Sequence, residues 1–246
     1  MSTPPAQETA PSPPGVTSLN LFGVGAFVFG VLLLVGTFVA PNFSEPGPTQ
    51  ANWVASNAVL AFLAADSYVW GLTAIAAIPF FAILGRLLRS RSQEGAFAAV
   101  LLSAIGVVLY FLRNILAVAS IDAASTLTAP SATQAAYQVN LLGDALNPLE
   151  PLGAACWGFG LILFGALIWR SGIFPNWLAI VAFVGGVAGW AVFPALTYTG
   201  QFIGYFFTEI FLPLLTAILA FLCGAIFVWR ARALRKGNPS SPSGAP

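Results

Sequence analysis

The 246-residue sequence contains no histidine and only one lysine, Lys236. Without histidine the chain cannot form imidazole-ligated haem, a histidine-bound zinc or copper site, or a Ser-His catalytic pair. Because Lys236 falls in the polar C-terminal segment, a Schiff-base cofactor on a lysine inside a membrane is also excluded. The sequence therefore predicts no metal site and no catalytic residue, and we expect a protein that is not an enzyme.

Charged residues are also scarce. They make up 7% of the chain, whereas 58% of its residues are hydrophobic. Soluble proteins carry about 25% charged residues, so this composition indicates an integral membrane protein. The 9 Lys and Arg residues nearly balance the 8 Asp and Glu residues, which leaves a formal net charge of +1. This balance excludes a basic nucleic-acid-binding surface, and no nucleic-acid partner is predicted.

The two ends of the chain, residues 1–17 and 237–246, are rich in proline, serine and other small residues. Such segments cannot bury enough apolar surface to offset the entropy cost of ordering, so both are predicted to be disordered tails. Residues 18–236 are expected to form one transmembrane domain. Since Arg86 is the first basic residue, the first apolar stretch lacks the cationic start of a signal peptide and is expected to remain as a membrane anchor.

The region between the tails contains apolar stretches of about 20 residues, the length needed to cross a bilayer as a helix. Lipid cannot hydrogen-bond exposed backbone groups, so each stretch must be helical. We therefore predict an all-α bundle of six transmembrane helices over residues 19–40, 67–88, 96–120, 151–169, 175–197 and 204–229. Two long connections are expected to form short helices on the outer face, over residues 50–65 and 131–146.

The basic residues predict the orientation of the bundle. Eight of the nine follow the second, fourth and sixth stretches: Arg86, Arg89, Arg91, Arg170, Arg230, Arg232, Arg235 and Lys236. An excess of Lys and Arg is typical of cytoplasmic connections. The sequence thus predicts a protein of the cytoplasmic membrane with both termini in the cytoplasm. Trp169, Trp177 and Trp229 mark the same boundary, as interfacial tryptophans do.

A few polar residues fall inside or beside the predicted spans. Arg113 and Glu209 each lie about 8–10 Å below the outer end of their spans, at the rise of an α-helix. Charged residues at such depth are candidate functional sites. We predict a polar cluster in the outer half, in which Arg113 pairs with Glu209 and is joined by Glu150 or Asp66 and the amide of Asn114. In the alternative, Arg113 and Glu209 extend separately to the outer headgroups.

Small residues gather in the fourth and fifth stretches. The fourth contains Ala154, Gly158 and Gly160, and the fifth contains a Gly-x-x-x-G pattern within Gly185, Gly186 and Gly189. Small residues allow helix backbones to approach closely in lipid. They are expected to pack helices within the bundle, and a contact between copies of the chain is the alternative.

The connection between these two stretches carries a recognisable motif, Arg170-Ser171-Gly172 followed by Pro175-x-Trp177-Leu178. Gly172 suits a left-handed position after a helix end, and Arg170 lies near the negative end of that helix. The motif resembles that of an uncharacterised bacterial six-span membrane family, domain of unknown function 4386, which has a similar connection followed by a glycine-rich helix. The resemblance implies a six-span bundle, and it implies no activity.

These patterns favour a non-enzymatic membrane component, either a self-contained bundle or an accessory subunit of a membrane assembly. The alternative is a small transporter or ligand-binding membrane protein that uses the Arg113 and Glu209 region. The expected partner is the lipid bilayer. Other membrane subunits or a second copy of the chain are additional candidate partners. No cofactor is predicted. A bound lipid remains an alternative, and so does a bound pigment whose metal is ligated by water, carbonyl or amide groups.

Overall fold

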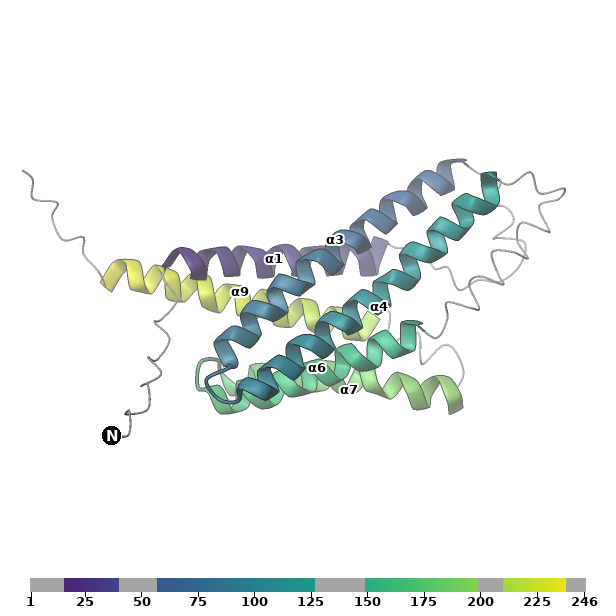
Figure 1. The fold of residues 1–246 in the computed structure, drawn as a ribbon. Coiled ribbons are helices and arrows are strands. Elements are labelled where there is room, and N and C mark those ends of the chain that lie inside the picture. The colour runs from purple at the N-terminus through teal and green to yellow at the C-terminus, as the bar shows by residue number, and fades with distance from the viewer. Residues whose placement is uncertain (1–15, 40–56, 127–148, 199–209, 238–246) are drawn as a thin grey trace, which may run out of the picture.

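The computed structural model describes residues 16–39, 57–126, 149–198 and 210–237 (Figure 1). These residues form six α-helices and no strand: α1 (Val16–Val39), α3 (Asn57–Leu88), α4 (Gln93–Thr126), α6 (Leu149–Ser171), α7 (Asn176–Tyr198) and α9 (Leu212–Gly237). Within the described residues, five of them (α1, α3, α4, α6 and α9) are long and apolar enough to cross a membrane, and α7 contributes a shorter apolar segment, Asn176–Trp190. An all-helical membrane bundle follows from these lengths and compositions.

The six helices overlap the six predicted stretches, and five of them qualify as membrane spans by length and composition. One prediction for the outer face is wrong. Residues 57–65 do not form part of a separate short helix, because they are the first turns of α3, which continues without a break to Leu88. The segment is rich in alanine and leucine and contains no glycine or proline that would end a helix there. Residues 50–56 and the predicted helix over 131–146 lie outside the described residues.

Helices α3 and α4 are much longer than a bilayer requires. Their 32 and 34 residues span about 48 and 51 Å, whereas the hydrocarbon core is about 30 Å thick. A short turn joins them at one end, so the excess length lies at the other end. Figure 1 shows the far ends of α3 and α4 reaching together beyond the other helices. This pair is therefore longer than one bilayer crossing needs, and the excess lies at the end that the sequence predicts to be the outer one.

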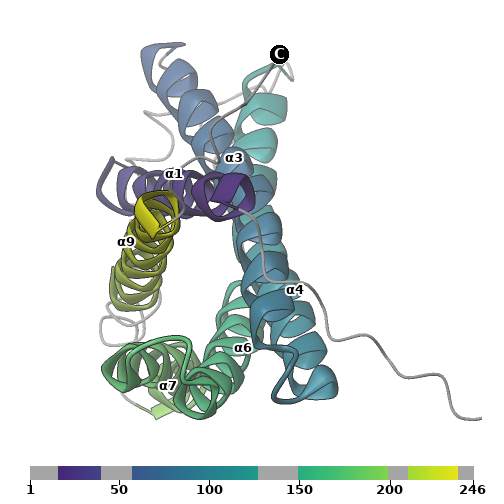
Figure 2. The ribbon, with the colours of Figure 1, turned by 90° about the vertical axis from the view of Figure 1, so that its left-hand side faces the viewer.

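The six helices form a ring in chain order. Each packs against the next one along the chain, and α9 returns to pack against α1 (Figure 2). At this closing contact the rings of Phe22 in α1 and Phe227 in α9 meet edge to face, with centroids 4.6 Å apart. Phe22 is near the start of α1 and Phe227 is near the end of α9, so the first and last helices are antiparallel. The start of α1 and the end of α9 thus share one end of the bundle.

Helix α6 is pressed against α4 at positions that only glycine can occupy. A Cβ atom on Gly106 of α4 would lie 2.2 Å from the backbone nitrogen of Trp157, and one on Gly153 of α6 would lie 2.6 Å from that of Tyr110. The contact also buries the Ser103 hydroxyl and the Trp157 indole nitrogen, for which the described residues provide no hydrogen-bond partner. Close packing, and not polar bonding of these two groups, therefore holds α4 against α6.

The opposite side of α6 meets α7 in the same way. A Cβ on Gly158 would lie 2.5 Å from the carbonyl oxygen of Gly186, and a Cβ on Gly189 would lie 2.7 Å from that of Ala154. Gly160 faces α4 instead, and Gly185 faces Leu215 of α9. The prediction that these small residues pack helices within the bundle is confirmed.

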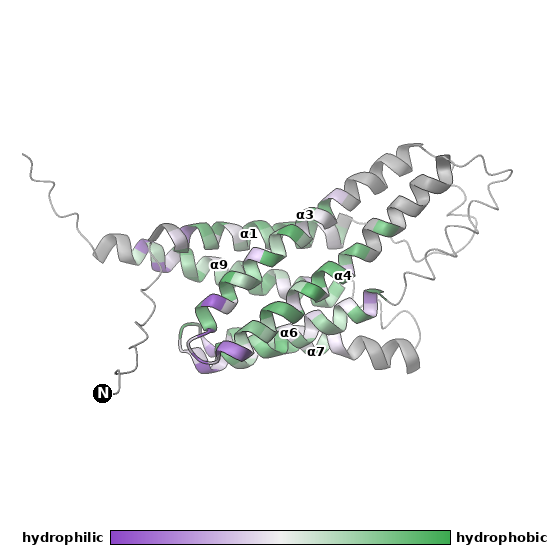
Figure 3. Ribbon diagram, in the orientation of Figure 1, coloured by the Kyte–Doolittle hydropathy of each residue, from purple (hydrophilic) through white to green (hydrophobic). Residues whose placement is uncertain are grey.

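The outer surface of the bundle is apolar along its middle. Figure 3 shows hydrophobic residues over the central turns, while hydrophilic residues gather at the end that holds the α3–α4 turn and the end of α9. Exposed large apolar side chains recur at helical spacing on α1 and α4: Leu21, Val24, Val28, Val31 and Val35 on α1, and Phe97, Leu101, Ile105 and Val108 on α4. These stripes suit contact with lipid chains.

We expect Gly106→Ala to destabilise the protein strongly in detergent. The added methyl group would meet backbone atoms of Trp157 that cannot rotate away, so α4 and α6 must separate, at a cost of about 1–3 kcal/mol or more. The measurement is the thermal unfolding midpoint. The matched control is Gly25→Ala in α1, where a Cβ has no atom within 4 Å. Equal midpoints for the two variants would contradict the close contact.

Candidate functional site

The structure describes only part of the predicted polar cluster. Glu150 lies in the first turn of α6 and is half-buried. The backbones of Asp66 and of Arg113 and Asn114 lie in α3 and α4, but their side chains fall outside the described residues, and so does the whole of Glu209. The pairing of Arg113 with Glu209 therefore stays a prediction.

The backbone register of α4 and α6 nevertheless brings one predicted pair of positions together. Tyr110 lies against Gly153 where the two antiparallel helices touch. Arg113 and Glu150 each come three residues from that contact towards the same end of the bundle, so their backbone positions lie at one level. Counted from Gln93, Arg113 lies about 30 Å along α4.

The opposite end of the bundle is described in full, and it contains the motif between α6 and α7. Gly172 has a φ of 62°, which confirms the left-handed conformation predicted for this position. The hydroxyl of Ser171 donates a hydrogen bond to the Ile168 carbonyl at 2.9 Å and accepts one from the Ile173 amide at 3.1 Å. The Leu178 amide then donates to the Pro175 carbonyl at 3.0 Å, where α7 begins. Ser171, Pro175 and Leu178 of the motif thus each take part in a hydrogen bond within the turn.

Two arginines from other parts of the chain bind this turn. The guanidinium of Arg91, from the α3–α4 turn, donates to the Ser171 carbonyl at 3.2 Å, and that of Arg230 in α9 donates to the Ile173 carbonyl. Carbonyls at the C-terminal end of a helix carry partial negative charge, so cations stabilise them. The sequence predicts that these arginines lie on one side of the membrane, but it does not show which carbonyl groups they bind. The two bonds place the α3–α4 turn, the α6–α7 turn and the end of α9 at one end of the bundle.

Aromatic side chains fill the interior next to this end. They come from four helices and from the α6–α7 turn, and all are buried: Phe22, Phe29, Phe80, Phe81, Phe164, Phe174 and Phe227. The rings of Phe81 and Phe164 stack with centroids 5.7 Å apart, and Phe174 meets Phe227 edge to face at 5.5 Å. The aromatic cluster thus connects α1, α3, α6, α9 and the turn.

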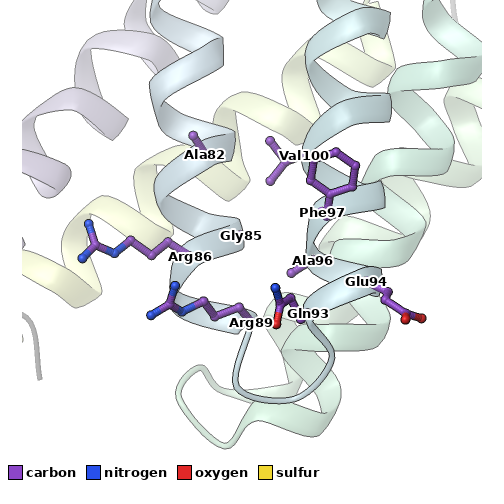
Figure 4. A pocket seen from close by; sticks show the side chains of 9 residues that line it. All are labelled: Ala82, Gly85, Arg86, Arg89, Gln93, Glu94, Ala96, Phe97 and Val100. Atoms are coloured by element: carbon purple, nitrogen blue, oxygen red, sulfur yellow. The ribbon is translucent and has the colours of Figure 1, made fainter. Parts of the chain in front are cut away.

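A groove opens between α3 and α4 at the same end, with a volume of about 690 Å³ (Figure 4). Its apolar walls include Ala82, Ala96 and Phe97, and polar side chains lie at its end. Figure 4 shows the Arg86 and Arg89 side chains extending from α3 to the side away from α4, while Glu94 extends from α4 in the opposite direction. Between the helices Gly85 has no side chain, and a Cβ there would lie 2.3 Å from a methyl group of Val100. The absence of a side chain at Gly85 thus allows α3 to approach Val100 of α4 closely beside the groove.

We expect Arg230→Ala to lower the free energy of unfolding by about 1–2 kcal/mol, because the Ile173 carbonyl loses a charged donor in a half-buried position. The effect is measured by thermal or denaturant unfolding in detergent. Arg232→Ala, an exposed arginine two residues further along α9, is the matched control and should change little. A loss as large in Arg232→Ala would mean that net charge, and not this bond, is responsible.

The register of Arg113 with Glu150 is tested by a double-mutant cycle. Arg113→Gln and Glu150→Gln should each destabilise the protein, and the double variant should lose less than their sum by about 0.5–3 kcal/mol. The same cycle with Glu209→Gln tests the pair that the sequence predicts, and it too should show a coupling. Strict additivity for Arg113 and Glu150 would show that the two side chains do not interact.

A family model described as a domain of unknown function, DUF4386, matches residues 21–229, which is most of the chain. No curated protein and no solved structure matches. The matched range begins within α1 and ends within α9, so it includes all six helices and the Arg170–Leu178 motif. The chain therefore belongs to the DUF4386 family.

Proposed function

We propose that the protein is a non-enzymatic component of the cytoplasmic membrane that acts as an accessory subunit of a membrane assembly. The observation that carries the proposal is the filled interior next to the arginine-rich end. Phe81 and Phe164 are fully buried there and stacked, and Phe22 and Phe227 close the contact between the first and last helices. A rigid, filled bundle is suited to holding a shape within the membrane.

A transport path through this interior would have to separate several aromatic contacts. Each pair contributes about 0.5–1.5 kcal/mol beyond the burial of its area. The contacts join α1, α3, α6 and α9, so opening would require several helices to move together. The close glycine contacts of α6 with α4 and α7 oppose such a movement. These features support a structural role over a transport role.

The expected orientation has support from the arrangement of the arginines. Arg91 and Arg230 bind the α6–α7 turn, so three basic connections lie at one end of the bundle. The start of α1 packs against the end of α9 at the same end. With basic segments in the cytoplasm, this arrangement supports a cytoplasmic location for both termini.

A second candidate is a ligand-binding membrane protein that is open to the outer side. The observation in its favour is the register of Arg113 with Glu150, together with the α3 and α4 turns that continue past the membrane. Charged positions of opposite sign at the outer boundary suit a polar ligand. The aromatic cluster lies at the inner end, so this candidate binds a ligand without carrying it across.

Thiol labelling distinguishes a filled interior from a transport path. Cys223 in α9 is fully buried, and with Cys156→Ser it becomes the only cysteine of the chain. We expect a membrane-impermeant thiol reagent to leave Cys223 unmodified from either side of sealed vesicles and to react only after denaturation. Arg89→Cys, made with Cys156→Ser and Cys223→Ala, is the exposed control and should react from the inner side.

Modification of Cys223 in the native membrane would contradict the filled interior and favour the transport alternative. The accessory role is read from the size of the particle in a mild detergent extract, compared with the 25.7 kDa of the chain. A particle that contains other subunits supports the role. A single chain under the same conditions would contradict it and leave a self-contained bundle.

A further inference from the structure

We propose that the groove between α3 and α4 binds an anionic phospholipid, with the phosphate at Arg86 and Arg89 and the acyl chains along Ala82 and Phe97. This inference goes beyond the proposed function; it rests on the cytoplasmic orientation proposed for the arginine-rich end and not on the accessory role. It rests on the order in which polar and apolar side chains follow one another along the groove.

The polar end of the groove carries a positive excess. Arg86 and Arg89 are three residues apart, so they share one face of α3, and both are exposed. Arginine binds phosphate oxygens through two parallel N–H groups. Glu94 is the acidic residue of the groove lining, and its side chain points away from the arginines (Figure 4). The groove end therefore attracts an anion and leaves both guanidinium groups accessible.

The rest of the groove is apolar and faces the same surface. On α3, exposed Ile78 and Ala82 precede Arg86 along one helix face. Across the groove, Phe97 of α4 is 68% exposed and Leu101 follows it one turn further into the membrane. A ligand that touches both parts must have an anionic end and a long apolar body. A phospholipid has this shape, whereas a free phosphate ion would use only the arginines.

The charge of the surroundings favours an anionic headgroup over a zwitterionic one. This end of the bundle also carries Arg91, Arg170, Arg230 and Arg232. Each basic residue near an anionic membrane surface contributes about 1 kcal/mol of attraction, and basic pockets between transmembrane helices on the cytoplasmic side are known to hold anionic headgroups. The groove adds to this general attraction a fixed pair of arginines beside an apolar wall.

The test uses the full chain purified in detergent, with phosphatidylglycerol and phosphatidylcholine of identical acyl chains as probes. Lipid retention is measured by native mass spectrometry, and stabilisation by the thermal midpoint. We expect retention and stabilisation with phosphatidylglycerol, and at least a ten-fold weaker apparent affinity in Arg86→Gln/Arg89→Gln. Arg170→Gln/Arg232→Gln removes the same charge from two exposed arginines outside the groove and should keep the affinity.

A further variant, Ala82→Trp, fills the apolar part without changing the charge and should also weaken lipid retention. Equal midpoints of all variants in phosphatidylcholine show that each is folded. The proposal is overturned if phosphatidylcholine is retained as well as phosphatidylglycerol, or if the Arg170/Arg232 control loses as much affinity as the groove variant. Equal stabilisation by inorganic phosphate alone would also overturn it, because the apolar walls would then have no part in binding.

Discussion

Backbone contact at glycine positions is the constraint on which the rest of this structure depends. Inside a bilayer the surrounding lipid is as apolar as the helix surfaces, so helices associate through close van der Waals packing. Helix α6 makes such contacts on two sides, through Gly153 and Gly160 with α4 and through Gly158 with α7. Once these three helices are held side by side, the short α3–α4 turn places α3 next to α4, and Arg230 of α9 binds the α6–α7 turn. The contact of α9 with α1 then closes the ring.

The two ends of the ring are built from different interactions. At the inner end, arginines of α9 and of the α3–α4 turn bind carbonyls of the α6–α7 turn, and aromatic rings fill the space behind it. At the other end, α3 and α4 continue beyond the remaining helices (Figure 1), and the backbone positions of Arg113 and Glu150 lie at one level. The bonds between turns and helices that the structure describes are thus concentrated at the arginine-rich end of the bundle.

The helices could be predicted from the sequence because a bilayer allows no other backbone structure in a long apolar stretch. The left-handed conformation of Gly172 could be predicted because it depends only on the neighbouring residues of the turn. Three features could not. The continuation of α3 through residues 57–65 depends on what the segment packs against, since the same residues suit a separate helix. Gly106 lacks a second glycine at the usual spacing, so its contact with Trp157 shows only in three dimensions. The common level of the Glu150 and Arg113 backbone positions depends on the register of two helices, which hydropathy does not determine.

The closing contact between the first and last helices tests the ring most directly. In a chain with Cys156→Ser and Cys223→Ala, the pair Gly23→Cys/Val228→Cys should form a disulfide within one molecule on mild oxidation in the membrane. A Cβ on Gly23 would lie 2.6 Å from a methyl group of Val228, whereas one on Gly25 has no atom within 4 Å. The account predicts rapid cross-linking of the first pair and none of Gly25→Cys/Val228→Cys. Equal cross-linking of both pairs, or disulfides formed only between two copies, would contradict the closed ring.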